Sequence, residues 1–183
     1  MSRIVRPAGP CRSGLYVVEG EVCLLVTAMR RGARWSSHSH QDDNQDTLMK
    51  GLSTLKEVLN EHRDLSQLEL AVFLTPFLEI IRSEETTGPV TSPALSAVNK
   101  IISYGLVDSN HPAVAICVEA IADAVTHARF MGADASGDGV VLMRVLQVLR
   151  ALMLSPAGDH LSNESVCEIM LSCFRICFET RLR

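Results

Sequence analysis

The sequence has few aromatic residues, no long apolar run and no excess of basic residues. Phe, Trp and Tyr make up 4% of the 183 residues, whereas β-sandwiches depend on aromatic and β-branched side chains. No uninterrupted apolar stretch reaches the length of a transmembrane helix. The formal net charge is −4 and the isoelectric point is near 5.8, so no basic field attracts nucleic acid. We therefore expect a soluble, mainly helical protein with no nucleic-acid partner.

Motifs of the common enzyme classes are also missing. The sequence contains no Walker loop, no GxGxxG and no GxSxG nucleophile elbow. His127 is the one candidate general base, and a histidine after an apolar run is more often part of the packing. We expect a chain without catalytic activity and without a cofactor, and keep a site around His127 as the enzymatic alternative.

Two segments contain metal-ligand residue types in incomplete sets. Residues 132–139, GADASGDG, match the first positions of a calcium loop, but Val145 stands where a bidentate glutamate is needed. His38 and His40 lie in a polar segment with nothing to orient them. We expect no metal site.

The cysteines and the N-terminal region indicate a reducing compartment. Six cysteines are present, and most lie in apolar helical patterns, where a free cysteine behaves as a small apolar residue. Glu19 and Glu21 interrupt the first apolar stretch, which argues against a secretory signal. We expect a cytoplasmic protein, with residues 1–14 as a disordered tail and residues 15–183 as one helical domain.

The spacing of apolar residues predicts about seven helices. We expect them over residues 15–31, 47–61, 66–82, 93–107, 110–130, 139–154 and 162–183, with loops at 36–46, 83–92 and 132–139. Ser66 and Glu69 have capping-box spacing, Pro76 predicts a kink, and Ser92-Pro93 has the pattern of a helix start. The fold class is therefore all-α, either a layered solenoid or a bundle.

The last two expected helices are apolar over most of their circumference. Residues 140–154 contain only three polar side chains, and the last helix has one narrow polar stripe. Such helices must be covered on at least two sides. Seven helices cannot cover all of this apolar surface by themselves, so we expect a partner, either a second copy or a downstream domain.

Several segments resemble one protein family. They are RRGARWSSH (30–38), LKEVLN (55–60), FLEIIRSEETTGPVT (77–91), ADAVTHARF (122–130), VVLMRVLQVLRALMLSPAGDHLSNESVCEIM (140–170) and SCFRICFE (172–179). They look like the N-terminal dimerisation and cyclophilin-binding domain of large Arf guanine-nucleotide exchange factors, nearest to the Golgi-specific brefeldin A-resistance type. The resemblance implies an irregular armadillo- or HEAT-like helical solenoid of about seven helices, and so favours the solenoid over the bundle.

The resemblance also implies a function and partners. In this family the domain self-associates, contacts the homology region that follows it, and helps to regulate recruitment to early-Golgi membranes. The exchange reaction on Arf belongs to a separate catalytic domain, of which these residues contain no part. The resemblance therefore implies a non-catalytic dimerisation and regulatory scaffold, peripheral on cis-Golgi and ER–Golgi intermediate membranes. The alternative is a membrane-recruitment module that binds lipid or a Golgi protein.

Two sets of residues are candidates for these contacts. Lys100 is the only cation in its helix and could pair with an acidic partner across a dimer interface, or be a solvated surface lysine. Asp138 precedes the sixth helix near the position where relatives carry an acidic residue, and Gly139 follows it. The candidate membrane patch is a small basic–aromatic cluster: Arg30, Arg31, Arg34 and Trp35.

Overall fold

A computed structural model describes residues 13–33, 42–128 and 135–181 of the chain. These residues form seven α-helices and two short 3-10 helices, with no strand among them. The helices are α1 (Ser13–Ala33), α2 (Asp42–Glu61), η1 (Leu65–Gln67), α3 (Leu70–Arg82), α4 (Gly88–Ser103), α5 (Val114–Thr126), α6 (Ala135–Leu154), η2 (Pro156–His160) and α7 (Asn163–Arg181). The all-α class expected from the sequence is confirmed.

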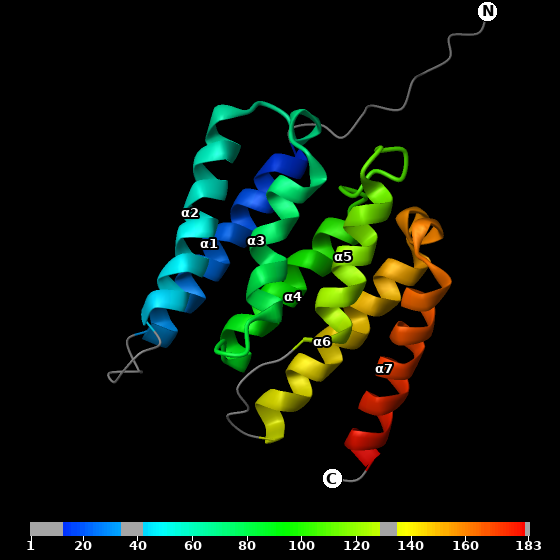
Figure 1. The fold of residues 1–183 in the computed structure, drawn as a ribbon. Helices are drawn as coiled ribbons and strands as arrows, with labels where there is room; N and C mark the ends of the chain where they lie inside the picture. Colours follow the sequence, from blue (N-terminus) through cyan, green and yellow to red (C-terminus); the bar gives the residue numbers. More distant parts are fainter. Residues whose placement is uncertain (1–12, 34–41, 129–134, 182–183) are drawn as a thin grey trace, which may run out of the picture.

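The helices are arranged in two layers (Figure 1). One layer contains α1, α4 and α6, where α4 packs between the other two. The second layer contains α2, α3, α5 and α7 in that order. The two layers are joined by contacts of α1 with α2, of α3 with α4, and of α6 with α5 and α7. Stacking helices in this way, so that each contacts only its neighbours, is the architecture of an α-solenoid.

The apolar core lies between the two layers. In α2 the predicted stripe of Leu48, Leu52, Leu55 and Leu59 is buried, as the four-three-four spacing requires. Complete burial of a leucine contributes roughly 1.5–3 kcal/mol relative to an exposed one. The largest buried aromatic side chains, Phe73 and Phe77, come from α3. Tertiary burial of these stripes therefore determines which faces of the helices point inward.

Helix α4 begins five residues earlier than the sequence predicts. The segment expected as a connection contains Thr87, the N-cap residue, and the helix starts at Gly88. The hydroxyls of Thr86 and Thr91 lie 3.0 Å apart in a buried hydrogen bond, and the Thr86 hydroxyl also donates to the Ile80 carbonyl at 3.2 Å. These buried contacts favour the earlier start, so that Pro93 lies inside the helix and not at its first position.

Four other helix starts differ from the sequence prediction by four or five residues. Helix α5 begins at Val114, where a start at residue 110 is expected. Helix α2 begins at Asp42 and α6 at Ala135, both inside segments expected as loops. The Ser66 capping box does not form, because Asp64 accepts a hydrogen bond from the Ser66 amide at 3.0 Å and caps η1. Helix α3 then starts separately at Leu70.

The predicted N-terminal tail can be compared with the structure only at its last residues. Residues 1–12 lie outside the described ranges, and α1 begins at Ser13. The division into a tail at 1–14 and a domain at 15–183 stays a prediction. Within the described ranges, no helix is both long enough and apolar enough to cross a membrane.

Candidate docking surface

Exposed apolar side chains concentrate on α6 and α7, at one end of the solenoid. Thirteen large apolar side chains are exposed among the described residues, and eight of them belong to these two helices. Scattered exposed apolar residues are normal on a protein surface, but a concentration of them marks an interaction site. We call this set the α6–α7 apolar face: Val140, Met143, Met153, Leu154, Met170, Leu171, Phe174 and Phe178.

Helix α7 has apolar side chains on two opposite sides. Ile169 and Ile176 are buried against the solenoid, whereas Leu171, Phe174 and Phe178 are 55–63% exposed. With 100° of rotation per residue, these three side chains and the exposed Met170 span an arc of about 100° on α7. That is the width with which a helix normally packs against a core. The exposed side of α7 therefore has the pattern of a buried helix face.

The opposite end of the solenoid has a different surface. Helix α2 exposes only polar side chains, if we consider its residues 46–61: Asp46, Thr47, Lys50, Ser53, Thr54, Lys56, Glu57, Asn60 and Glu61. Terminal units of solenoids carry such a polar outer face, which ends the stack in water. The outer surface of α2 is therefore polar, although its neighbour α1 exposes Tyr16 and Leu24, whereas the outer surface of α7 is apolar.

Helix α7 is fixed to α5 through Glu119. The Glu119 carboxylate accepts hydrogen bonds from the Ser162 amide at 2.5 Å and from the Ser165 hydroxyl. The Ser162 hydroxyl accepts from the Ser165 amide at 3.1 Å, which confirms the helix start expected at Ser162 or Asn163. The hydrogen bond from the Ser165 hydroxyl, together with that from the Ser162 amide, lowers the pKa of Glu119.

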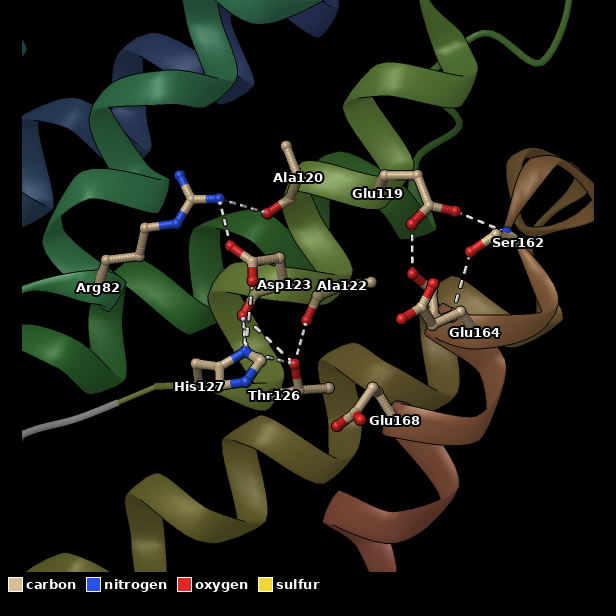
Figure 2. A pocket seen from close by; sticks show the side chains of 11 residues that line it. Arg82, Glu119, Ala120, Ala122, Asp123, Thr126, His127, Ser162, Glu164 and Glu168 are labelled. Atoms are coloured by element: carbon tan, nitrogen blue, oxygen red, sulfur yellow. Dashed lines mark hydrogen bonds and ion pairs between the residues drawn. The ribbon is translucent and has the colours of Figure 1, made fainter.

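A polar groove of about 530 Å³ lies between α5 and α7, beside this contact (Figure 2). The Arg82 guanidinium reaches it from α3 and binds the Asp123 carboxylate at 3.0 Å and the Ala120 carbonyl at 3.1 Å. Glu164 and Glu168 of α7 line the other side. The groove thus combines the ion pair between α3 and α5 with the acidic first turns of α7.

The hydrogen bonds and the ion pair of the His127 side chain with described residues all involve one of its ring nitrogens. Its Nδ1 atom lies 3.0 Å from the Asp123 carbonyl, 3.3 Å from the Asp123 carboxylate and 3.2 Å from the Thr126 hydroxyl. A catalytic triad needs the two ring nitrogens to contact different groups, whereas these contacts share one nitrogen. The Thr126 hydroxyl also donates to the Ala122 carbonyl at 2.8 Å, so its proton is engaged. His127 ends α5 as part of its C-terminal hydrogen bonding.

Lys100 has an acidic partner within its own chain. Its Nζ atom lies 2.5 Å from the Glu21 Oε1 atom of α1, and the Glu21 side chain is only 9% exposed. From the sequence we expect an acidic partner of Lys100 in a second copy, or a solvated lysine without a partner. Glu21 lies 79 residues earlier in the chain, and no local pattern connects the two positions.

The two candidate interface residues, Asp138 and Lys100, lie far from each other within one chain. Asp138 lies in the first turn of α6. A Cβ atom added to Gly88, at the start of α4, would lie 3.4 Å from the Val141 side chain of α6. Lys100 is farther along α4 by a helix length of about 18 Å at 1.5 Å per residue. The two candidate interface residues therefore lie towards opposite ends of α4, and their role in a dimer stays a prediction.

The candidate membrane patch is only partly described. Arg30 and Arg31 are exposed in the last turn of α1, where cations suit the helix dipole. Arg34 and Trp35 lie outside the described residues. The patch therefore stays a prediction.

Comparison with known proteins identifies the family. The family model of the Mon2/Sec7/BIG1-like dimerisation and cyclophilin-binding domain matches residues 33–182. The chain is 44% identical to the Golgi-specific brefeldin A-resistance guanine nucleotide exchange factor 1 homolog of Caenorhabditis elegans, over 93% of the chain and 9% of that relative. It is 34% identical to the ARF guanine-nucleotide exchange factor GNOM of Arabidopsis thaliana, over 91% of the chain and 12% of that relative.

A more distant relative shows the same limited coverage. The chain is 26% identical to ARF guanine-nucleotide exchange factor 2 of Saccharomyces cerevisiae, over 90% of the chain and 13% of that relative. In each case the match covers nearly the whole chain but about a tenth of the relative. The match over most of the chain and the helical solenoid agree, and the chain belongs to the dimerisation and cyclophilin-binding domain family of large Arf guanine-nucleotide exchange factors.

Proposed function

We propose that this chain is the non-catalytic N-terminal scaffold of a large Arf guanine-nucleotide exchange factor that acts on early-Golgi membranes. In this proposal the chain self-associates and docks on the homology region of the same protein. The family match supports a scaffold domain of an exchange factor, and the names of the relatives support Golgi traffic. The catalytic step on Arf is assigned to another domain of the protein.

The α6–α7 apolar face is the observation that carries the docking proposal. Its eight large side chains are each 39–71% exposed, and burial of the exposed part contributes roughly 1 kcal/mol for each. The exposed arc of α7 has the width and spacing of a face that packs against another helix. We assign this face to helices of the homology region, which would continue the stack.

Two features argue against other occupants of the same face. End-to-end stacking of a second copy would place the polar α2 surface against it, and polar surface is a poor partner for Phe174 and Phe178. The charge of α7 does not favour an anionic membrane, because Glu164 and Glu168 are exposed along it and outnumber its exposed Arg175. A helical protein segment with its own apolar stripe fits both the apolar arc and its polar edge.

The test compares two leucines of similar exposure. Leu171 is 55% exposed in α7 and Leu24 is 57% exposed in α1, at the far end of the solenoid. We expect Leu171→Glu to weaken binding of the purified homology region at least about tenfold, which is about 1.4 kcal/mol. Leu24→Glu should bind as the unchanged chain does, in isothermal titration calorimetry. Equal binding by both variants, or equal loss, would contradict docking through α7.

Self-association is tested separately by light scattering over a concentration series. A closed pair should have a mass of about twice the 20.0 kDa chain. A strict monomer at the highest concentration would refute self-association and leave the docking proposal unaffected.

A further inference from the structure

One charged side chain is buried in the described part of the molecule. Glu21 is 8% exposed, and the other buried polar residues are two threonines and a serine. It lies on α1 beside Val18, Val22 and Leu25, which are fully buried. A carboxylate in such surroundings destabilises the fold unless a cation and hydrogen bonds compensate its charge.

Lys100 supplies that compensation. Its Nζ atom donates to the Glu21 carboxylate at 2.5 Å, and its side chain remains 39% exposed. The neighbouring residues Ala97 and Ile101 of α4 are buried, so the lysine stem leaves the core at the junction of the two helices. Of the ion pairs between described residues, this one alone joins α1 to α4.

We propose that Lys100 is a positioning residue that fixes α1 against α4 through Glu21, and that it makes no direct contact with a second copy. This inference rests on the proposed self-association, because it states how Lys100 affects that property. Loss of the lysine would leave an unpaired carboxylate at the α1–α4 junction and displace α1. Self-association would then weaken because the layer of α1, α4 and α6 is disturbed.

Two variants distinguish the effect of an unpaired Glu21 carboxylate from the effect of losing the Lys100 side chain. Removal of one partner of a buried ion pair is strongly destabilising, whereas replacement of both partners by neutral side chains is close to neutral. Lys100→Met leaves Glu21 unpaired. The double variant Glu21→Gln, Lys100→Met contains neither charge and also lacks the lysine that a direct contact would need.

The experiment measures thermal unfolding and solution mass for the same four proteins: the unchanged chain, both variants, and Lys56→Met as a control. Lys56 is an exposed lysine of α2. We expect Lys100→Met to lower the Tm by about 5 °C and the double variant to recover most of that loss. Light scattering should show the double variant self-associating as the unchanged chain does, and Lys56→Met should change neither measurement.

Two results would overturn the proposal. One is an unchanged Tm for Lys100→Met, which would mean that the ion pair does not fix α1. The other is a double variant that recovers its Tm but no longer self-associates, which would place Lys100 in the interface. If the unchanged chain is monomeric, the proposed self-association fails, whereas the Tm comparison still decides whether Lys100 positions α1.

Discussion

Charged side chains connect helices that are far apart in the sequence. Arg82 of α3 binds Asp123 of α5, and Lys100 of α4 binds Glu21 of α1. Glu119 of α5 accepts hydrogen bonds from the first residues of α7. These residues fix neighbouring units of the solenoid to one another, in addition to the apolar core.

Replacement of Glu119 tests the contact between α5 and α7. Glu119→Gln removes the ionised acceptor of the Ser162 amide and the Ser165 hydroxyl. We expect a loss of about 1 kcal/mol, because the site is solvent-accessible, and a Tm lower by roughly 2–4 °C. Glu168→Gln, in the same groove, is the control and should leave the Tm within about 1 °C. Equal Tm values for both variants would show that Glu119 contributes nothing.

The stabilising effect of Glu119 should also depend on pH. The pKa of Glu119 in the folded chain is lower than its ordinary value of 4.5. Ionised Glu119 therefore stabilises the fold fully above pH 4.5, and this contribution is lost as the pH falls through the lowered pKa. The Tm difference between the unchanged chain and Glu119→Gln should be constant from pH 7 to about 5 and should shrink below pH 4.5. A difference that grows in acid would contradict this assignment.

Residue partners were the part of the site that the sequence could not predict. Lys100 was recognised as unusual because it is a cation in an apolar helix. Its partner Glu21 stands out in the sequence only because it interrupts an apolar stretch. Glu119 gave no signal at all, since its partners lie more than forty residues away. Such contacts follow from the packing of helices, which a single sequence does not reveal.

Helices were predicted best where an apolar stripe continues over several turns. The leucine stripe of α2 and the apolar run of α6 identify those helices, because the spacing of apolar residues along the sequence directly predicts a helix with a buried side. Helix starts were predicted less well. Ser92-Pro93 is a good local start signal, but the buried hydroxyls of Thr86 and Thr91 favour a start at Gly88. Tertiary contacts therefore override local capping signals.

Gly158 tests the junction between α6 and α7, and Gly139 near the start of α6 serves as its comparison. A Cβ atom at Gly158 in η2 would press on the backbone carbonyl of Leu152, whereas one at Gly139 in α6 would meet open space. Gly158→Ala should cost about 1–3 kcal/mol through this clash. Gly139→Ala should stabilise α6 by about 0.5–1 kcal/mol, because alanine loses less backbone entropy. Urea unfolding measures both, and a tolerated Gly158→Ala would show that η2 can move away from α6.

At the scale of the whole molecule, the two ends of the solenoid differ. The α2 end exposes polar side chains, and the α7 end exposes Leu171, Phe174 and Phe178. The sequence already indicated that the last helices need cover on more than one side. It could not show which side stays open, because that depends on how α5 and α6 pack against α7. The structure shows that this side of α7 stays exposed among the described residues, and the proposed docking would use it.

Hydrogen exchange of the chain, alone and with the purified homology region, tests the central claim most directly. Docking through the α6–α7 apolar face predicts slower exchange of the α6 and α7 amides when the homology region is added, because helices buried in an interface open less often. The amides of α2 should exchange at the same rate in both samples. Slower exchange confined to α1 and α2, or no change in α7, would contradict the assignment of this face.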